Sequence, residues 1–403
     1  MSFPALPYEL VSHIASFLDP SPFFSAHEAP SITRARRVAG RALALVSRNA
    51  VLPGREMIWR RVVVGMHRNP EMLDRLLGSE EDSAPTELVR ELVFLAGPKT
   101  ARTALERELG KLLPRFGRLE LLSLAATPSV LERLLSSVAG DGREAAERVR
   151  YLELHSSLGS SPSYPAALLA ALPHFVSAQT LTLDLRLPSD TTLPQIPSSP
   201  APLALRPHTL SLTIDDLDSY PPCAAFIAHL LPLISVPHLS TFSLFSAYAP
   251  PSLFSSLRSA SGLASLTLSL SVGPLATRMP DLVALLPFLG ELRRLKFLVQ
   301  PITSAPLILS PSHALQPALL AALPAALEEF ELDIDFCAPA GQLAADVREL
   351  LDSRLEDGRL QSWMSVEWEE GMAMRRAVGL VRVVRDGRAQ WSMMDGEEEE
   401  GED

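Results

Sequence analysis

The amino-acid sequence predicts an α/β protein, with a small N-terminal helical module followed by an array of short parallel strands and helices. Three observations predict this class. Pairs of large apolar residues recur about every 30 residues, segments with the helical period lie between the pairs, and an amphipathic helix precedes the first pair. The expected parts are the helical module over residues 3–60, the repeat array over 61–385 and a disordered acidic tail over 386–403.

The composition narrows the class further. Hydrophobic residues make up 47% of the chain, which excludes a protein that is disordered throughout. The 35 prolines favour many short elements joined by turns over one coiled coil or a few large central sheets. A net charge of −11 argues against a general nucleic-acid binder. Cys223 and Cys337 match no zinc spacing and no disulfide framework.

No segment near the N-terminus has the features of a signal peptide, since it lacks a basic region and is interrupted by Pro4, Pro7 and Glu9. The longest apolar runs are shorter than the ~18 residues that a membrane span needs. We therefore expect a soluble protein of the cytoplasm, the nucleus or both, with no membrane partner.

The apolar pairs predict the strands. Each pair lies in a short alternating run, such as 209–214 or 265–270, and alternation with a period of two predicts a strand with one buried face. Met364 and Val366 are a possible eleventh pair. The ten regular pairs are Val62/Val64, Leu92/Phe94, Leu122/Leu124, Leu152/Leu154, Leu181/Leu183, Leu210/Leu212, Phe242/Leu244, Leu266/Leu268, Leu295/Phe297 and Phe330/Leu332.

Segments with the helical period separate the strands, and several begin with Pro or with a Ser, Thr or Asp cap. Residues 188–207 contain six prolines and no helical period, so a loop is expected there in place of a helix. The expected helices span residues 71–77, 100–113, 129–137, 166–172, 224–231, 252–257, 281–286 and 316–322.

One strand and one helix in each unit of ~30 residues resembles the pattern of a leucine-rich-repeat solenoid. The Asn or Cys that normally closes the strand turn is replaced by residues such as Ala125, His155 and Thr213, so the repeats are divergent. A doubly wound α/β fold is the alternative. Against it, the strands alternate with Ser and Thr, and neither GxGxxG nor GxxxxGK[ST] occurs.

The N-terminal segment predicts a small helical bundle. Leu10, Ile14, Phe17 and Leu18 share one face of a helix that Asp19-Pro20 ends. A second stripe follows at Leu43, Val46 and Ala50, and Trp59 comes after an expected break at Pro53-Gly54. Trp59 is expected to anchor the bundle to the first repeat.

The order of these residues resembles an F-box. The matching motifs are Leu6-Pro7-x-Glu9-Leu10, Ile14, Leu18-Asp19, Val46-Ser47-Arg48 and Trp59, with an unusually long loop expected at 20–36. The resemblance implies a module that binds the Skp-type adaptor of a cullin–RING ubiquitin ligase. The adaptor-binding residues that it implies are Leu6, Pro7, Leu10, Ile14 and Val46.

The implied function is the substrate-recognition subunit of an SCF-type (Skp–cullin–F-box) E3 ubiquitin ligase. The chain would bind the adaptor through the module, an unknown protein target through the repeats, and be monomeric within the complex. Two alternatives stay open. One is a non-catalytic repeat scaffold whose N-terminal helices act only as a cap. The other is an undetected hydrolase, against which the absence of HExxH and GxSxG motifs argues.

The residue between the members of each apolar pair is expected on the open face of the sheet. The series from Val93 and Ser123 to Lys296 is mostly small and hydroxylated, and the last unit is acidic. Glu329, Glu331 and Asp333 are therefore possible target-binding residues for a basic segment, the alternative being that they are simply solvated. The sequence predicts no enzyme activity, no cofactor and no metal.

Overall fold

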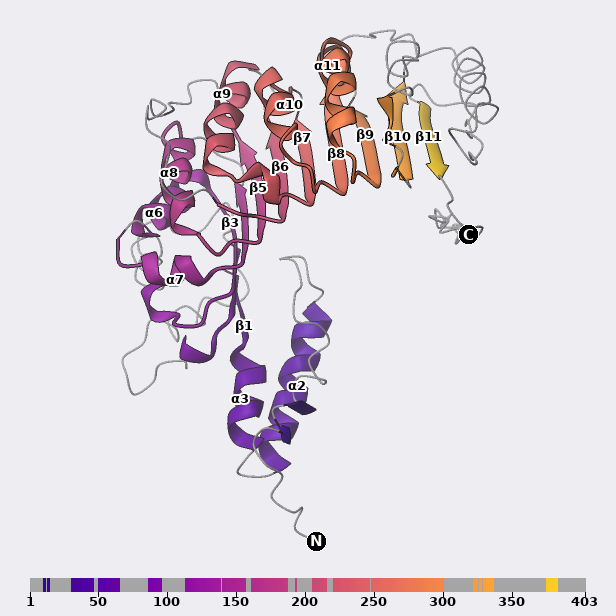
Figure 1. Ribbon diagram of the computed structural model, residues 1–403. Helices are drawn as coiled ribbons and strands as arrows, with labels where there is room; N and C mark the ends of the chain where they lie inside the picture. Colours follow the sequence, from indigo (N-terminus) through magenta and orange to yellow (C-terminus); the bar gives the residue numbers. More distant parts are fainter. Residues whose placement is uncertain are drawn as a thin grey trace, which may run out of the picture.

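A computed structural model describes residues 10–11, 13–14, 30–46, 50–65, 86–95, 113–138, 140–156, 161–187, 193, 205–215, 220–246, 248–300, 322–324, 326–327, 329–336 and 375–382. Within these residues the protein is an α/β structure whose strands form a single curved sheet (Figure 1). The predicted α/β class is confirmed.

Strand order in the sheet follows the order of the chain. Every neighbouring pair from β1 to β10 is parallel, and β11 runs antiparallel to β10. A doubly wound sheet reverses its strand order near the middle, so that alternative is wrong. The strands are β1 Arg61–Gly65, β2 Glu91–Leu95, β3 Leu121–Ala126, β4 Tyr151–Ser156, β5 Thr180–Arg186, β6 Thr209–Asp215, β7 Thr241–Ser246, β8 Ser265–Ser271, β9 Arg294–Gln300, β10 Glu329–Phe336 and β11 Arg375–Arg382.

All ten regular apolar pairs lie in strands β1 to β10, each pair in its own strand. In β5 the buried residues Leu181, Leu183 and Leu185 alternate with partly exposed ones, as the period of two predicts. Strand β11 was not predicted, and the possible pair Met364/Val366 lies outside the described residues.

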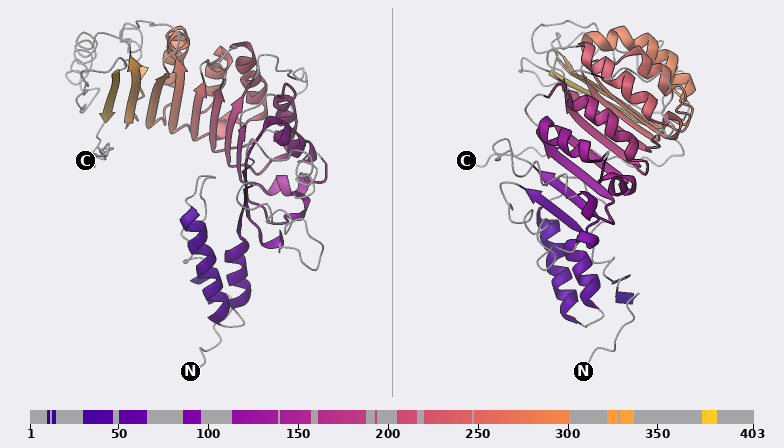
Figure 2. Two further views of the ribbon diagram at one scale, coloured as in Figure 1. Left: turned by 180° about the vertical axis from the view of Figure 1, so that it is seen from behind. Right: turned by 90° about the vertical axis from the view of Figure 1, so that its left-hand side faces the viewer.

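Helices cover one face of the sheet, on the outer side of its curve (Figures 1 and 2). The predicted helices at 129–137, 166–172, 224–231 and 252–257 are present, α7 was missed, and α11 begins nine residues earlier than the predicted start at Asp281. The α-helices among the described residues are α2 Pro30–Val46, α3 Val51–Trp59, α6 Pro128–Val138, α7 Arg143–Arg148, α8 Tyr164–Ala171, α9 Tyr220–Leu230, α10 Pro251–Leu257 and α11 Val272–Leu285.

Four predictions fall on residues that are hardly described. The expected helices at 71–77, 100–113 and 316–322 lie almost wholly outside the described residues. In the expected loop at 188–207, Leu193 and residues 205–207 are described, and none of them is helical.

A Leu-Pro dipeptide ends three of the helices. Short 3₁₀ turns at Leu172–His174, Leu231–Leu233 and Leu286–Phe288 follow α8, α9 and α11 directly. Each has Pro in its second position, where the missing N–H and the ring prevent the α-helical ladder from continuing. Part of the high proline content therefore marks the turns between helix and strand.

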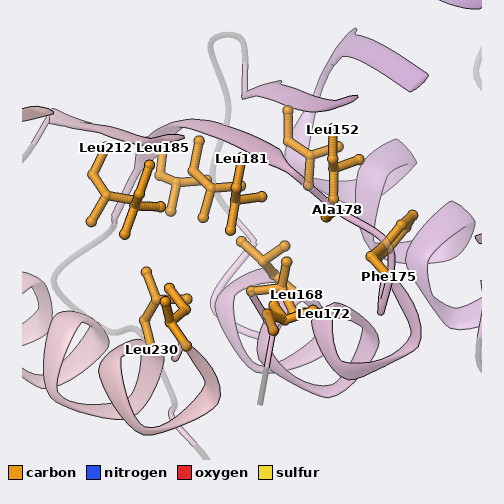
Figure 3. Close-up of a cluster of buried hydrophobic side chains, with 14 of the residues drawn as sticks. Leu152, Leu168, Leu172, Phe175, Ala178, Leu181, Leu185, Leu212 and Leu230 are labelled. Carbon is orange, nitrogen blue, oxygen red and sulfur yellow. The ribbon is translucent and has the colours of Figure 1, made fainter. Parts of the chain in front are cut away.

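The core lies between the helices and the sheet. In Figure 3, Leu168 of α8 and Leu230 of α9 extend toward strand residues that include Leu181 and Leu212. These side chains are fully buried and belong to one cluster that continues from Val62 of β1 to Leu327. Burial of apolar surface contributes about 25 cal/mol per Å², so this continuous cluster is the main source of stability.

A backbone ladder fixes the register of neighbouring units. At the edge where the parallel strands begin, one carbonyl oxygen in each unit accepts two N–H groups from the next unit, at 2.7 to 3.0 Å. Each unit therefore places the side chain of its accepting residue at this edge. The accepting carbonyls belong to Arg60, Arg90, Glu120, Arg150, Gln179, His208, Ser240 and Ala264.

Two details of the N-terminal module differ from the prediction. Helix α2 begins at Pro30, so the expected loop at 20–36 is helical over its last seven residues. The expected break at Pro53-Gly54 is wrong, because α3 runs from Val51 through both residues. Pro53 is the third residue of α3, where its missing N–H would have had no intrahelical partner.

Candidate interaction surfaces

The N-terminal module leaves large apolar side chains exposed. Leu10 and Ile14 have helical backbone and are 50% and 42% exposed, whereas Val11 between them is buried. Leu10 and Ile14 lie one helical turn apart and so share a face. The other expected adaptor-binding residues are not described at this level: Leu6 and Pro7 lie outside the described residues, and Val46 ends α2 without a described side chain.

Helix α2 carries two further exposed apolar residues that were not predicted from the sequence. Leu45 is 87% exposed and Val38 is 60% exposed. The two residues lie seven positions apart, so they share one face of α2. Of the predicted stripe, Leu43 lies in α2 and is half-buried, whereas Ala50 is buried and lies beyond the end of α2. The spacing of Val38 and Leu45 was the available indication of a second apolar face.

The junction between the module and the sheet combines an apolar contact with a buried ion pair. Trp59, the last residue of α3, packs against the core cluster, as expected for an anchor. Arg61 of β1 and Glu91 of β2 are almost fully buried, with 3.2 Å between Nη1 and Oε2. Arg60 donates to the other oxygen of Glu91, also at 3.2 Å. An ion pair of this kind depends on both partners, because a lone buried charge is costly.

The open face of the sheet lines the inner side of its curve (Figure 1). At the start of the predicted series, Val93 and Ser123 are fully buried. From β4 to β9 the corresponding positions are partly exposed, and the strand register aligns them in one row. The row consists of Glu153, Thr182, Ser211, Ser243, Thr267 and Lys296.

Hydroxyl groups dominate the centre of this face. A second row of Thr180, Thr209, Thr241 and Ser265 runs beside the first. Hydroxyl groups both donate and accept hydrogen bonds and carry no charge. This surface therefore suits a partner that offers backbone amides or polar side chains. At its margin His155 Nδ1 lies 3.4 Å from Asp184 Oδ2, which gives one possible ion pair when the histidine is protonated.

The acidic residues expected to bind a target lie on β10, between two strands that carry basic residues. Glu329 is in register with Arg294 of β9 and Arg382 of β11, and Glu331 is in register with Lys296. Asp333 is in register with Leu298 and Val378. The basic residues in register with Glu329 and Glu331 lower the net negative charge of this part of the sheet. The pairing with Arg382 could not be predicted from the sequence, because β11 was not predicted.

Neither a metal-ligand cluster nor a membrane-spanning helix is found among the described residues. In that part of the chain no group of three or more His, Cys, Asp and Glu side chains is placed to hold a metal ion. None of its helices combines the length and apolar character needed to cross a bilayer.

In comparisons with known proteins, no protein-family model matches this chain and no curated protein matches its sequence.

Proposed function

We propose that this chain is the substrate-recognition subunit of an SCF-type (Skp–cullin–F-box) E3 ubiquitin ligase, acting in the cytoplasm or the nucleus. In this proposal the N-terminal helices form an F-box module, and the strand–helix units form a leucine-rich-repeat-like solenoid. The module binds a Skp-type adaptor, and the open face of the sheet binds a protein target. The chain itself has no catalytic role and is monomeric within the complex.

The exposure of Leu10 and Ile14 is the observation that carries the proposal. Both residues belong to the sequence that resembles the F-box motif, and both present apolar surface to solvent. Adjacent exposed leucine and isoleucine side chains are costly in an isolated protein and are typical of a surface that a partner covers. The exposed Val38 and Leu45 of α2 add apolar area to the module.

The position of the module supports a bridging role. Helix α3 leads directly into β1, and Trp59 packs against the core of the repeats. A module attached in this way holds its exposed apolar residues at a fixed place relative to the open sheet face. Such a connection suits a receptor that must present a bound target to other subunits.

The scaffold function is the second candidate. The packing of Trp59 and the buried Arg61–Glu91 pair are also what a cap needs in order to close the first unit of a repeat array. In that case the exposed apolar residues have no specific partner.

Copurification separates the two candidates. The full-length protein is coexpressed with a Skp-type adaptor, beside the variants Leu10→Asp and Ile14→Asp. The receptor proposal predicts a stable complex for the parent and its loss for both variants. Val176→Asp is the matched control, since Val176 is also an exposed apolar residue, 39% accessible, but lies in the repeats. If the adaptor fails to bind the parent protein, the scaffold candidate replaces the receptor proposal.

A further inference from the structure

An arginine-lined hollow opens at the edge of the sheet where the parallel strands begin. Its volume is about 390 Å³, and it lies at the starts of β2, β3 and β4. Positive groups outnumber negative ones two to one among its lining side chains. The charged lining residues are Arg90, Arg118, Arg148, Arg150, Glu120 and Glu147.

Two of the four arginines, Arg118 and Arg150, keep most of their hydrogen-bonding capacity, whereas Arg90 and Arg148 use part of theirs within the protein. Arg90 pairs with Glu120 at 3.1 Å, and Arg148 donates to the carbonyl oxygen of Gly117 at 2.7 Å. By contrast, the Arg150 side chain forms no hydrogen bond or ion pair within the described part of the chain. Arg118 has one long ion pair there, 3.7 Å from Glu56, and its side chain is 58% exposed. These two guanidinium groups are available to an anionic ligand.

The arrangement suits a ligand with several carboxylates in series. Arg90, Arg118 and Arg150 come from three successive units, so their positive charges are spread along the edge of the sheet. Neighbouring strands lie about 4.8 Å apart, which spaces these charges over roughly 10 Å. A single small anion would contact only part of this row, whereas an extended acidic peptide can contact all of it.

The chain itself contains a matching segment. Residues 395–403 carry seven acidic side chains and no basic one. Strand β11 is antiparallel to the rest, and its last residue, Arg382, is in register with Glu329, the first residue of β10. Strand β11 therefore ends at the edge where the parallel strands begin, which is also the edge that holds the hollow.

The segment is long enough to reach the hollow. Seven strand spacings separate β11 from β4, or about 34 Å along the sheet, and the straight path across a curved sheet is shorter. The thirteen residues from Arg382 to Asp395 can span about 43 Å when extended. Arg293 and Arg294 lie nearer to β11 on the same edge, but both already take part in other interactions of the chain.

We propose that the arginine-lined hollow is a binding site for an acidic peptide and that residues 395–403 of the same chain occupy it. Attachment to β11 supplies a high effective concentration, so contacts that are weak between separate molecules suffice. Occupation would neutralise the surplus positive charge at the starts of β3 and β4. The proposal stands apart from the ubiquitin-ligase proposal, because neither an adaptor nor a target takes part in it.

A fluorescent synthetic peptide of residues 395–403 tests the site. Its binding is measured by anisotropy at low ionic strength, against the full-length protein and a variant that ends at Met394. The truncated protein should bind the peptide about tenfold or more tightly than the full-length protein, whose own segment competes. Equal binding by the two proteins, or no binding by either, would overturn the proposal.

Charge reversal locates the site. In the truncated protein, Arg118→Glu with Arg150→Glu should weaken peptide binding about tenfold or more, because the attractive contacts become repulsive. Arg41→Glu with Arg206→Glu makes the same change in net charge at two other exposed arginines and should weaken binding by less than about threefold. Equal losses in both double variants would show nonspecific attraction and contradict the proposal.

Two further measurements control for misfolding of the variants and for binding between two copies of the chain. A peptide in which Glu397, Glu398, Glu399 and Glu400 are replaced by Gln should lose binding, and its result does not depend on the folding of a variant protein. Sedimentation of the full-length protein should give a monomer over the concentration range of the assay. A dimer that disappears on truncation would place the segment on a second copy and refute the intramolecular contact.

Discussion

Gly40 of α2 and Gly54 of α3 face each other where the two helices of the N-terminal module pack together. A Cβ atom on Gly54 would lie 2.6 Å from the carbonyl oxygen of Gly40, and one on Gly40 would lie 2.8 Å from the carbonyl oxygen of Gly54. Both distances are too short for a carbon atom, so only glycine permits this approach at either position. The pair therefore sets the spacing between α3 and α2, the helix that carries the exposed Val38 and Leu45.

Alanine at position 54 should separate α2 from α3. Because the obstacle is backbone on one side and the Cβ of Ala44 on the other, the helices must move apart, which we expect to cost about 1–3 kcal/mol. Chemical denaturation monitored by circular dichroism measures this loss. Gly262→Ala is the matched control, since a Cβ there meets nothing within 4 Å. Equal stability of the two variants would contradict the packing described here.

Neutralising Glu91 should destabilise the junction of β1 and β2. Glu91→Gln leaves the buried Arg61 with no charged partner in this pair, and breaking a buried ion pair typically costs about 3–5 kcal/mol. The free energy of unfolding gives the loss directly. Glu147→Gln breaks the exposed pair with Arg143 and should cost less than about 1 kcal/mol.

A double variant examines whether charge itself is needed at the junction. Arg61→Met with Glu91→Leu replaces the pair by apolar side chains, which is often neutral for stability, and it also removes the contact of the partly exposed Arg60 with Glu91. It should be more stable than Glu91→Gln alone. If the double variant is the less stable of the two, the charged side chains contribute more to stability than the apolar side chains that replace them.

Tyr164 should make stability fall at alkaline pH. Burial raises the pKa of its phenol far above the usual value, and the negative charge of Asp184 raises it further. The folded protein therefore keeps this proton at a pH where the unfolded chain loses it. The contribution is fully present below the unfolded pKa of about 10 and is lost as the pH rises above it.

The variant Tyr164→Phe isolates this effect. The Tyr164 hydroxyl is buried and has no hydrogen-bond partner in the described part of the protein, so its removal should leave stability at pH 7 unchanged or raised. Between about pH 9 and pH 11 the free energy of unfolding should fall less in the variant than in the parent. Equal falls in both proteins would show that the phenol keeps its ordinary pKa.

The regular part of the fold could be predicted because its pattern is local. The two residues of each apolar pair lie on the same buried face of their strand. Alternation along the sequence was therefore enough to predict ten of the strands. Strand β11 has a weaker alternation that includes Gly379, and its position depends on antiparallel pairing with β10. Helix α7 has only Ala145 and Ala146 as buried residues, which is too little apolar surface for a helical period to be recognised.

The surfaces depended on contacts between distant residues and were harder to predict. Val93 and Ser123 are fully buried although each lies between the two members of an apolar pair, and alternation within a strand does not report burial of that face. The arginine-lined hollow combines residues from three units. One indication was available in the sequence. Charged residues recur at intervals of 30 positions, at Arg60, Arg90, Glu120 and Arg150. The backbone ladder has the same period, so it aligns these residues in a row at the edge of the sheet.

Adaptor binding is the most direct test of the central claim. The affinity of the full-length protein for a purified Skp-type adaptor can be measured by calorimetry, together with Leu10→Asp, Ile14→Asp and the control Val176→Asp. We expect measurable binding by the parent and the control, and at least about a tenfold loss for each N-terminal variant, because a charge would be buried in an apolar contact. No binding by the parent, or equal binding by all four proteins, would contradict the assignment of the N-terminal helices as an adaptor-binding module.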